Sequence, residues 1–569
     1  MPANISATTA IPAGDRTAWK AAGRMRLRRR ACCSLCWMKV FSIKEGKPTM
    51  RKTLDQMTLE EKVGQLFTFY YKETVYAEEA EQYIAGYKAG GIFLDMECLE
   101  EPEQVHKLTS RMQEASLTRG SGLPLFVAAD FVAGAGCKLS RGGAVHFPKN
   151  MAIGAANDER LAYESGKATA DESLAMGVNF NYSPVVDINN NPDNPVIGTH
   201  SFGGSRELVS RMGAAVIRGY QERGMIATAK HFPGHGDTNV DSHLDLPVLP
   251  FDRDRLEAFE LVPFRKAIEA GVDAIMVGHI AVPALDPGML PASLSRPMVT
   301  GLLREELGFD GLVVTDGMSM KGVTSKYTQA KACVMALQAG ADILLVCPER
   351  GDEAQEMVDA VLGAVKSGKL SESRIDESAA RIMQMKEKYG LTPDRFKLQP
   401  YEASAFEQEE AKLVSLELAR KALRASGSEE LWAGVLSGVT NWMLIGEKQL
   451  AEFAVRLSDS GIVTEVRQIG TYEELQEVLA ETPGERPVIA AVTHNKRMKR
   501  DALERVNRIA SERGGPMLLV HFGSPYDIEG LPDLPVILLY DRAPSLQEAA
   551  AEYVNNVLHQ HDGRDRYDA

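Results

Sequence analysis

The segment from Lys230 to His243 carries a dense set of titratable side chains. It follows the apolar run Met225–Ala229, which is typical of a buried strand, and then becomes a loop punctuated by glycine and proline. Three histidines and two aspartates lie in this loop: His231, His235, Asp237, Asp241 and His243. Loops carried by a rigid scaffold are where catalytic and binding residues concentrate. A solvated loop of hydrogen-bonded histidines would have the same composition. Residues elsewhere in the chain are therefore needed to distinguish such a loop from a catalytic one.

Asp316 is the second candidate, because it follows the apolar run Leu312–Thr315 directly. A carboxylate at the end of a buried strand can attack an electrophilic carbon if it is held ionised and close. Glycoside cleavage needs such a nucleophile on one side of the sugar and a proton donor on the other. Histidine exchanges protons near neutral pH, and a neighbouring carboxylate fixes its tautomer. We therefore predict Asp316 as nucleophile and His243 as acid/base with Asp241 as its partner.

Asp241 and His243 are two residues apart, and an ideal strand would not bring their side chains into contact. The pair therefore requires a turn. Lys230 and His231 leave the strand before that turn, and we expect them to bind sugar hydroxyls together with Asp130. His279, at the end of another apolar run, is assigned to the same sugar-binding set. His235 lies between two glycines and either serves the site or pins the loop.

Short apolar runs alternate with longer amphipathic stretches along the first two thirds of the chain, which indicates a parallel sheet covered by helices. Seven such units with a weaker eighth, over roughly 330 residues, favour a (β/α)8 barrel of the TIM type. The expected strands are 90–94, 124–129, 178–186, 225–229, 274–278, 312–315 and 343–346, and helices are expected over 158–176, 208–223, 254–270 and 327–339. From Thr58, a capping-box pattern with Val63, Leu66 and Phe67 at helical spacing predicts a further helix.

Polar residues follow these strands at their carboxyl ends, which converge on one face of a barrel. They are Asp95, Asp130, Asp187, Lys230 with His231, His279 and Asp316. A single aspartate at a strand end is more often a helix cap than a catalyst. Six strands that end in this way favour an active site.

The last part of the chain repeats the α/β pattern on a smaller scale. Residues 391–408 are a predicted linker, and 409–569 a predicted α/β/α sandwich domain with a helix over 409–425. Its expected strands are 441–445, 462–466, 488–493, 517–522 and 536–540. The barrel is assigned to residues 50–390, and 1–49 is interpreted as a disordered or misannotated extension. Fewer side chains that could take part in catalysis follow the strands of the second domain, which favours a mainly structural role for that domain.

Composition narrows the class of function further. The formal net charge of −14 argues against nucleic acid as a partner, and no apolar run reaches the ~18 residues of a membrane span. The seven cysteines have no repeating spacing, which suggests reduced thiols and a cytoplasmic location. No glycine-rich phosphate-binding loop is present. We expect a carbohydrate substrate, no cofactor and no metal, in a monomer or homodimer.

Four blocks together resemble glycoside hydrolase family 3, in its β-N-acetylhexosaminidase branch. They are KHFPGHGDT at 230–238, DSH at 241–243, VTD at 314–316 and NPVIGTHSFG at 194–203. The resemblance implies a retaining hydrolase with a covalent glycosyl-enzyme intermediate. Asp316 matches the nucleophile, His243 the acid/base and Asp241 its partner, while Lys230, His231 and Asp130 match sugar-binding positions. The implied substrate is a terminal β-linked N-acetylglucosamine, commonly in muropeptides during peptidoglycan recycling.

Two positions depart from the family pattern. His200 stands where the family usually has arginine, whose fixed fork of donors histidine cannot reproduce. After Asp130 the family usually shows x-Glu-Gly-Gly, whereas this chain has Phe-Val-Ala-Gly. Both positions lie among the expected sugar-binding residues, and His200 is counted in that set. The two departures therefore affect the choice of sugar more than the type of reaction.

Four alternatives stay open at this point. A neutral histidine acid/base repels phosphate less than a carboxylate would, so the enzyme could be a phosphorylase. The two departures from the family pattern also leave open a family 3 glycosidase for another sugar. His231, His235, Asp237 and His243 are acceptable metal ligands, which would suit a metallohydrolase. The altered pocket could also make the chain a sugar-binding protein without turnover.

Overall fold

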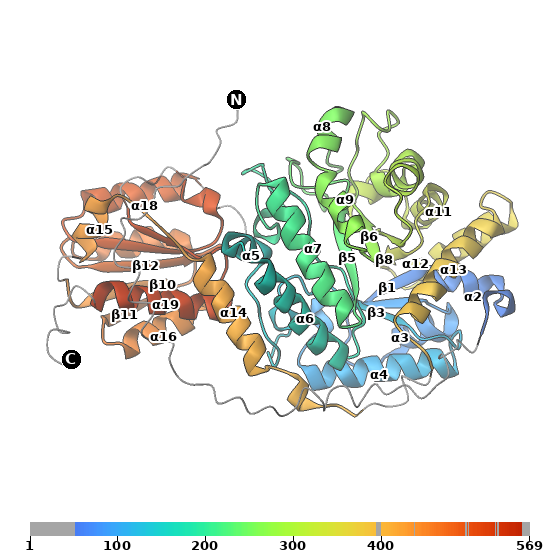
Figure 1. Cartoon of the computed structure of the whole chain (residues 1–569), viewed down its shortest axis with the longest axis horizontal. Helices are drawn as coiled ribbons and strands as arrows, with labels where there is room; N and C mark the ends of the chain where they lie inside the picture. The colour runs from blue at the N-terminus through green and yellow to red at the C-terminus, as the bar shows by residue number, and fades with distance from the viewer. Residues whose placement is uncertain are drawn as a thin grey trace. The chain divides into compact units, whose positions relative to one another are not determined.

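The computed structural model describes residues 52–393, 400–436, 439–494, 498, 500–529, 531 and 534–559 (Figure 1). The predicted extension 1–49, with Cys32, Cys33 and Cys36, lies outside the described residues. The cysteines that are described, Cys98, Cys137, Cys333 and Cys347, are free. None of the described helices is long and apolar enough to cross a membrane.

The first part of the chain is an eight-stranded parallel barrel, as predicted. The strands pair in the order β7-β6-β5-β4-β3-β2-β1-β8, and a parallel bridge between Val314 and Ile343 joins the two ends of the series. Every residue of β2, β3, β4, β6, β7 and β8 is buried, as strands covered on both faces require. The strands are β1 (Phe67–Tyr71), β2 (Gly91–Leu94), β3 (Phe126–Ala129), β4 (Phe180–Asn181), β5 (Ile226–Phe232), β6 (Ala274–Val277), β7 (Leu312–Thr315) and β8 (Leu344–Val346).

Helices cover the outside of these strands, and Figure 1 shows α4, α6 and α7 lying over the barrel. Some of them begin at a side-chain cap: Asp158 accepts hydrogen bonds from Arg160 N and Leu161 N at the start of α6. The helices of this part are α2 (Leu59–Gln65), α3 (Glu78–Glu81), α4 (Pro102–Thr118), α5 (Asn150–Ala156), α6 (Glu159–Ala175), α7 (Arg206–Glu222), α8 (Arg253–Ala258), α9 (Val262–Glu269), α10 (Lys321–Thr324), α11 (Gln329–Ala339), α12 (Glu353–Lys366) and α13 (Glu372–Lys388), with a π-helical segment at Pro297–Glu306.

The start of the barrel differs from its prediction. The capping box is confirmed, since Glu61 N donates to Thr58 Oγ1 at 3.2 Å and Thr58 N to Glu61 Oε2 at 2.9 Å. The helix nevertheless ends at Gln65, and Phe67 begins β1 instead of continuing it. Leu66 and Phe67 are both buried, so apolar spacing alone could not separate the last turn of a helix from the first residue of a strand.

Three further predictions need correction. The helix expected over 254–270 is two helices, α8 and α9, with Pro263 in the first turn of the second. Lys230 and His231 lie inside β5 instead of after it. The strand expected over 178–186 is only two residues long, although Val185 makes an isolated bridge with Lys230. The register of β5 against β6 shifts between Ala229 and Phe232, so the end of β5 is irregular where the candidate residues sit.

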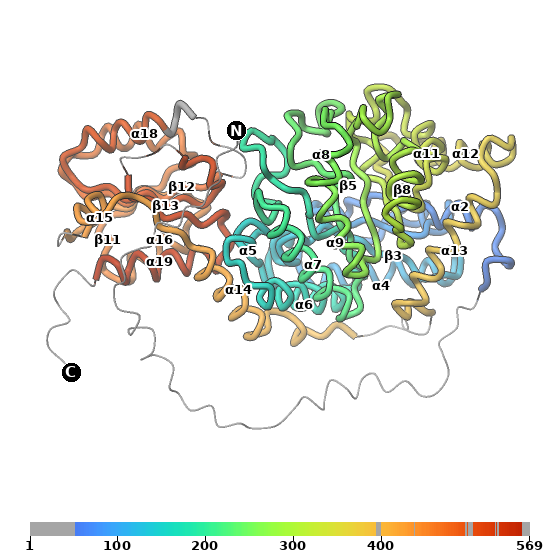
Figure 2. The backbone as a smooth tube through the Cα atoms, turned by 45° about the horizontal axis from the view of Figure 1, so that its top comes forward, coloured from blue at the N-terminus to red at the C-terminus, as the bar shows by residue number. Residues whose placement is uncertain are grey.

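The C-terminal part contains a second sheet with the order β11-β10-β12-β13-β14-β9. Its first strand, β9, is antiparallel to β14 and was not predicted, because Arg424–Ser426 is short and exposed or half-buried. The other pairs are parallel, with helices on both faces (Figure 2). The elements are α14 (Glu409–Ala422), β9 (Arg424–Ser426), α15 (Glu429–Leu436), β10 (Trp442–Glu447), α16 (Ala451–Asp459), β11 (Val463–Ile469), α17 (Leu475–Glu481), β12 (Val488–Thr493), α18 (Arg500–Glu512), β13 (Met517–Phe522), β14 (Val536–Leu538) and α19 (Pro544–His559).

Helix α14 packs on both parts of the chain. It contacts α5 and α6 of the barrel as well as α19 of the second sheet, and it runs beside α5 and α6 in both views (Figures 1 and 2). Met151 and Ala152 of α5 belong to the same buried cluster as Trp442 and Phe522. Apolar burial therefore continues from the second sheet to the barrel helix that follows the loop after β3.

Glu172 on α6 links that loop to the linker. Its side chain is only 2% exposed, and its carboxylate accepts hydrogen bonds from Val145 N at 3.0 Å and from Glu407 N at 2.9 Å. Burial, with the nearby charges of Glu407 and Asp171, raises the pKa of Glu172 from 4.5 to about 7. A carboxyl group whose pKa is raised by folding stabilises the fold below its unfolded pKa, and this contribution is lost as the pH rises through the folded value.

We predict that Glu172→Gln changes the pH dependence of stability. Glutamine cannot ionise, so the free energy of unfolding of the wild type should fall relative to the variant by about 3 kcal/mol as the pH rises from roughly 4.5 through 7. Chemical denaturation of both proteins across this range measures the difference. Glu164→Gln, on the same helix, is the matched control and should leave the curve unchanged; parallel curves for wild type and Glu172→Gln would contradict the prediction.

Candidate active site

Asp316 lies at the carboxyl end of β7, where its backbone N donates to Val277 O of the neighbouring strand at 3.0 Å. One carboxylate oxygen, Oδ1, accepts a hydrogen bond from Gly317 N at 2.8 Å. Burial would raise the pKa of Asp316, but the charge of His231 above all, with His279, the Gly317 hydrogen bond and Lys230, holds it below its usual 3.8. The group is therefore an ionised carboxylate in a desolvated setting, which is what nucleophilic attack requires.

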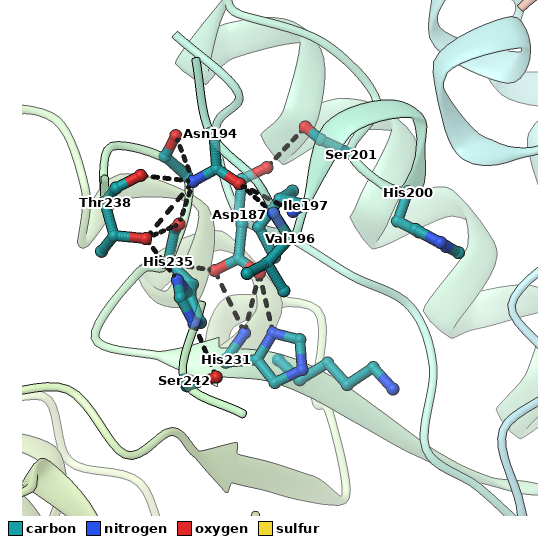
Figure 3. A network of polar contacts seen from close by, with 12 residues as sticks. Asp187, Asn194, Val196, Ile197, His200, Ser201, His231, His235, Thr238 and Ser242 are labelled. Carbon is teal, nitrogen blue, oxygen red and sulfur yellow. Dashed lines mark hydrogen bonds and ion pairs between the residues drawn. The ribbon is translucent and has the colours of Figure 1, made fainter. Parts of the chain in front are cut away.

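Asp187 is the centre of the hydrogen bonds that shape the end of β5. It is 1% exposed, and it accepts hydrogen bonds from His231 N at 3.1 Å and His235 N at 2.7 Å. His231 Nδ1 lies 2.9 Å from Asp187 Oδ2 and donates its proton to this carboxylate, which leaves Nε2 for another partner (Figure 3). One buried carboxylate thus orients the His231 ring and the backbone on both sides of Pro233.

His235 pins the loop. It is 1% exposed, with Nδ1 2.7 Å from Thr238 Oγ1 and Nε2 3.1 Å from Ser242 Oγ. Burial, helped by the charge of His231, lowers its pKa, so the ring is neutral. Of the two roles left open from the sequence, these contacts favour loop support.

Asn194 ties the loop 194–203 to the same region. Its Nδ2 donates to His235 O at 2.8 Å and to Thr238 O at 3.1 Å, while its Oδ1 accepts from Ile197 N at 2.7 Å (Figure 3). Gly236 is required here, because a Cβ at this position would lie 1.8 Å from Ile188 O. The glycines and the asparagine of these blocks therefore let two loops approach closely.

Asp241 and His243 form the expected pair. His243 Nδ1 is 2.8 Å from Asp241 Oδ1, and His243 N donates to the same oxygen at 2.9 Å. The turn that this contact needs is present, with Leu244 N donating to Asp241 O. The side chain of His243 is 64% exposed and that of Asp241 13%, so the imidazole reaches solvent while its carboxylate partner is largely covered.

Ser242 joins this turn to the segment that follows β7. It is 2% exposed, contacts His235 Nε2 through Oγ, and accepts a hydrogen bond from Gly322 N at 3.0 Å through its backbone oxygen. Gly322 is the second residue of α10, the helix that follows the loop after β7, and a Cβ there would also meet His279 Cβ. The Asp241–His243 turn and Asp316 therefore belong to one face of the barrel.

Lys230 and Asp130 form an ion pair at 2.6 Å, and their side chains are 7% and 33% exposed. Burial would raise the pKa of Asp130, but Lys230, Lys138 and His200 lower it.

His200 lies to one side of the Asp187 network (Figure 3). Burial, together with the charge of Lys149, lowers its pKa to about 3. The imidazole at the position of the family's arginine is therefore neutral.

His279 is placed differently from the other predicted sugar-binding residues. It is fully buried, with Nδ1 2.7 Å from Ser293 Oγ and Nε2 2.9 Å from Gly317 O. Since a carbonyl oxygen only accepts, Nε2 carries the proton, and burial lowers the pKa of the ring. Both ring nitrogens are thus engaged, and the contacts are those of a residue that supports the loop of Asp316.

Two residues of this site were not predicted to act in it. From the sequence, Asp187 was recognised only as a residue at the end of a strand. The signal in the sequence that could have indicated its role was an aspartate followed by a loop that returns to β5. Tyr70 was missed with β1. Burial and then the charge of Asp316 raise the pKa of Tyr70, and a Cβ on Gly317 would lie 3.6 Å from its hydroxyl.

Among the described residues, no group of three or more histidine, cysteine, aspartate or glutamate side chains is arranged to hold a metal ion. The ligand candidates of the metallohydrolase alternative point to separate partners. His231 contacts Asp187, His235 contacts Thr238 and Ser242, and His243 contacts Asp241.

The C-terminal part reaches two loops of the site. Tyr526 OH donates to Asn189 O at 2.7 Å, two residues beyond Asp187. Asp541 Oδ2 accepts from Lys149 N at 2.6 Å, at the start of α5, and Asn150 Nδ2 donates to His200 O at 2.8 Å. The loops that carry Asp187 and His200 are therefore held partly from outside the barrel.

A parallel (β/α)8 barrel with ionisable residues at the carboxyl ends of its strands defines a class of enzymes in which that face is the active site. The family described as "Glycosyl hydrolase family 3 N terminal domain" matches residues 58–385. The chain therefore belongs to glycosyl hydrolase family 3.

Relatives and solved structures agree with this assignment. The chain is 34% identical over 334 residues to beta-hexosaminidase A of Pseudoalteromonas piscicida, which covers 55% of this chain and 56% of that protein. It is 31% identical over 359 residues to the beta-N-acetylglucosaminidase/beta-glucosidase of Cellulomonas fimi, covering 61% and 60%. The matches thus span little more than half the length of these relatives. The β-N-acetylglucosaminidase of Paenibacillus sp. str. FPU-7 superimposes with a TM-score of 0.80 at 33% identity, over 88% of this chain and 97% of that one.

We predict that Asp187→Asn loosens the end of β5. An amide has one acceptor oxygen. With that oxygen at the Oδ1 position the new NH2 group faces His231 Nδ1–H, and in the flipped orientation it faces both backbone N–H donors. The free energy of unfolding should therefore fall by about 3 kcal/mol. Hydrogen exchange at His231 N and His235 N should become faster. Asp245→Asn, at an exposed aspartate of the same loop, is the matched control. Unchanged exchange at both amides in Asp187→Asn would show that Asp187 does not anchor them.

Proposed function

We propose that the protein is a retaining glycoside hydrolase that removes a terminal β-linked N-acetylglucosamine through a covalent glycosyl-enzyme intermediate. The observation that carries this proposal is the ionised Asp316 at the carboxyl end of β7, followed in the same segment by Gly322, whose backbone N donates to Ser242 O in the turn of Asp241 and His243. The names of the relatives, beta-hexosaminidase and β-N-acetylglucosaminidase, support the choice of sugar.

In the proposed first step, Asp316 attacks the anomeric carbon and forms a carbon–oxygen bond while the bond to the leaving oxygen breaks. The protonated His243 donates from Nε2 to that oxygen, because Nδ1 is held by Asp241. In the second step, His243 Nε2 accepts a proton from water, whose oxygen attacks the anomeric carbon and releases Asp316 as a carboxylate. Two displacements on one carbon retain its configuration.

The sugar hydroxyls are assigned to Lys230, Asp130 and His231, with His200 at the edge of the set. The Lys230–Asp130 ion pair provides both a donor and an acceptor in one rigid unit. His231 offers Nε2, since its Nδ1 is fixed by Asp187. His279 enters this proposal as a positioning residue for Asp316. Muropeptide fragments are the proposed natural substrate, and the free thiols described fit a reducing compartment such as the cytoplasm.

We predict that Asp316→Ala lowers kcat/KM for 4-nitrophenyl N-acetyl-β-glucosaminide by at least ~10³-fold, because the nucleophile is lost. Wild-type protein incubated with a slow fluorinated substrate should gain the mass of one glycosyl group on Asp316. Asp310→Ala, at an exposed position before β7, is the control. Equal and negligible turnover by wild type and Asp316→Ala would instead leave a sugar-binding protein, and formation of sugar 1-phosphate in phosphate buffer would identify a phosphorylase.

His243→Ala tests the proton donor separately. An activated aryl leaving group needs little protonation, whereas a sugar leaving group needs a full proton. We predict that the variant loses far more activity, by at least ~10²-fold, on a disaccharide than on the 4-nitrophenyl substrate. Steady-state kinetics on the two substrates give this ratio, and an equal loss on both would remove His243 from the role of acid.

A further inference from the structure

The loop from Asp187 to Gly203, which we call the site loop, is bonded to itself at its two ends. Ser201 Oγ donates to Asp187 O at 2.6 Å, and Asn189 N donates to Gly203 O at 3.0 Å. Asp187 in turn fixes the ring of His231, whose Nδ1 lies 2.9 Å from Asp187 Oδ2. Because the two ends are bonded to each other, a displacement of one end displaces the other.

The second sheet contacts the first end of the site loop through one phenol. Tyr526 follows β13, and its OH donates to Asn189 O at 2.7 Å. Asn189 is 1% exposed, and its backbone N and O are both bonded, one inside the site loop and the other to the second sheet. A Cβ on Gly204 would lie 3.6 Å from the same OH. The phenol therefore packs where the two ends of the site loop meet.

Helix α5 carries a second contact, to the other end of the site loop. Asp541 follows β14 and is 5% exposed, and its carboxylate accepts from Lys149 N at 2.6 Å and from Ala543 N at 2.7 Å. The next residue, Asn150, donates from Nδ2 to His200 O at 2.8 Å. The start of α5 thus lies between a carboxylate of the second sheet and the backbone of His200.

Packing leaves α5 little freedom between these two contacts. On one side, Met151 and Ala152 belong to the same buried cluster as Trp442 of β10. On the other side, a Cβ on Gly154 would lie 1.8 Å from Phe202 O, so the helix and the site loop approach at backbone distance. Closely packed interiors transmit displacement. The position of the second sheet is therefore passed through α5 to the end of the site loop.

We propose that Tyr526 and Asp541 are positioning residues for sugar binding, and that they act through the site loop on His231 and His200. The inference rests on the proposed function, in which both histidines belong to the sugar-binding set. Sugar binds only the arrangement of the loop that places these side chains correctly, so any population lost to other arrangements lowers the apparent affinity by the same factor. The second sheet is then part of the binding machinery as well as a support.

Two conservative substitutions in the full chain remove the two contacts. Tyr526→Phe deletes only the OH, and Asp541→Asn leaves one acceptor oxygen for two backbone donors. We expect each variant to raise the Kd of N-acetylglucosamine, measured by calorimetry, by at least ~3-fold, which is within the contribution of one hydrogen bond. The kcat for 4-nitrophenyl N-acetyl-β-glucosaminide should change by less than ~2-fold, because neither side chain bonds to the reacting groups. A loss of kcat with an unchanged Kd would overturn the proposal.

Hydrogen exchange distinguishes loss of positioning from a general loss of stability. Asn189 N and His200 N are both bonded to carbonyl oxygens of the site loop. Exchange at these amides should become at least ~3-fold faster in both variants. Exchange at Asp316 N, which is bonded to β6 of the barrel, should not change. In the wild type, saturating N-acetylglucosamine should slow exchange at the same two amides, because binding and loop order are linked. Equal acceleration at Asp316 N would assign the effect to global stability and contradict the proposal.

Tyr553→Phe, at a half-buried tyrosine of α19, and Asp459→Asn, at an exposed aspartate of α16, are the matched controls and should keep the wild-type Kd. Wild-type affinity in both Tyr526→Phe and Asp541→Asn would overturn the inference and leave the proposed function intact. If Asp541→Asn fails to fold, Tyr526→Phe carries the test.

A second sugar separates this inference from the proposed function. If the wild type hydrolyses the 4-nitrophenyl glucoside instead, the proposed function has the wrong sugar, and the same variants are then compared with glucose as the ligand. Raised Kd values for glucose would still support the positioning role. A wild type that neither binds nor hydrolyses either sugar would overturn both proposals.

Discussion

The site depends first on one buried carboxylate that is not itself proposed to react. Asp187 accepts two backbone hydrogen bonds and one imidazole hydrogen bond from the end of β5. Leaving any of these donors unpaired in a buried setting would cost more than an ordinary hydrogen bond contributes. The chain can therefore leave β5 in only one way, and this fixes the ring of His231, the neutral His235 and, through Ser242, the turn of Asp241 and His243.

The charge of Asp316 is sustained by the same arrangement. Desolvation opposes an ionised carboxylate at the end of a buried strand, so nearby positive charge must offset it. The electrostatic interaction with His231 contributes most to lowering the pKa of Asp316, and the orientation of that ring is set by Asp187. His279 has both nitrogens engaged and holds Gly317, whose backbone N donates to Asp316. Asp187 thus favours the ionised form of a second aspartate indirectly, through the histidine that it orients.

The barrel fold and most of the candidate site residues were predictable from the sequence, because barrel strands are near-continuous apolar runs and polar residues follow at their carboxyl ends. The Asp241–His243 contact follows from two residue types and a turn. The role of Asp187 could not be predicted, since a strand-end aspartate looks the same whether it caps a helix, binds a sugar or collects donors from a loop 44 residues later. β1 and Tyr70 were missed because Leu66 and Phe67 continue a helical spacing across a change of structure.

The C-terminal part of the chain was expected to be mainly structural, and its contacts suggest a more specific place for it. Tyr526 and Asp541 hydrogen-bond to backbone atoms of the barrel at Asn189 and Lys149. These atoms belong to segments next to Asp187, which anchors the candidate site, and next to His200, which departs from the family pattern. A barrel alone can hold the reacting groups, because those lie on its own strands and loops. The segments of Asp187 and His200 are different: contacts from both sheets hold them, so changes in the second sheet can shift these segments without disturbing Asp316 or the Asp241–His243 pair.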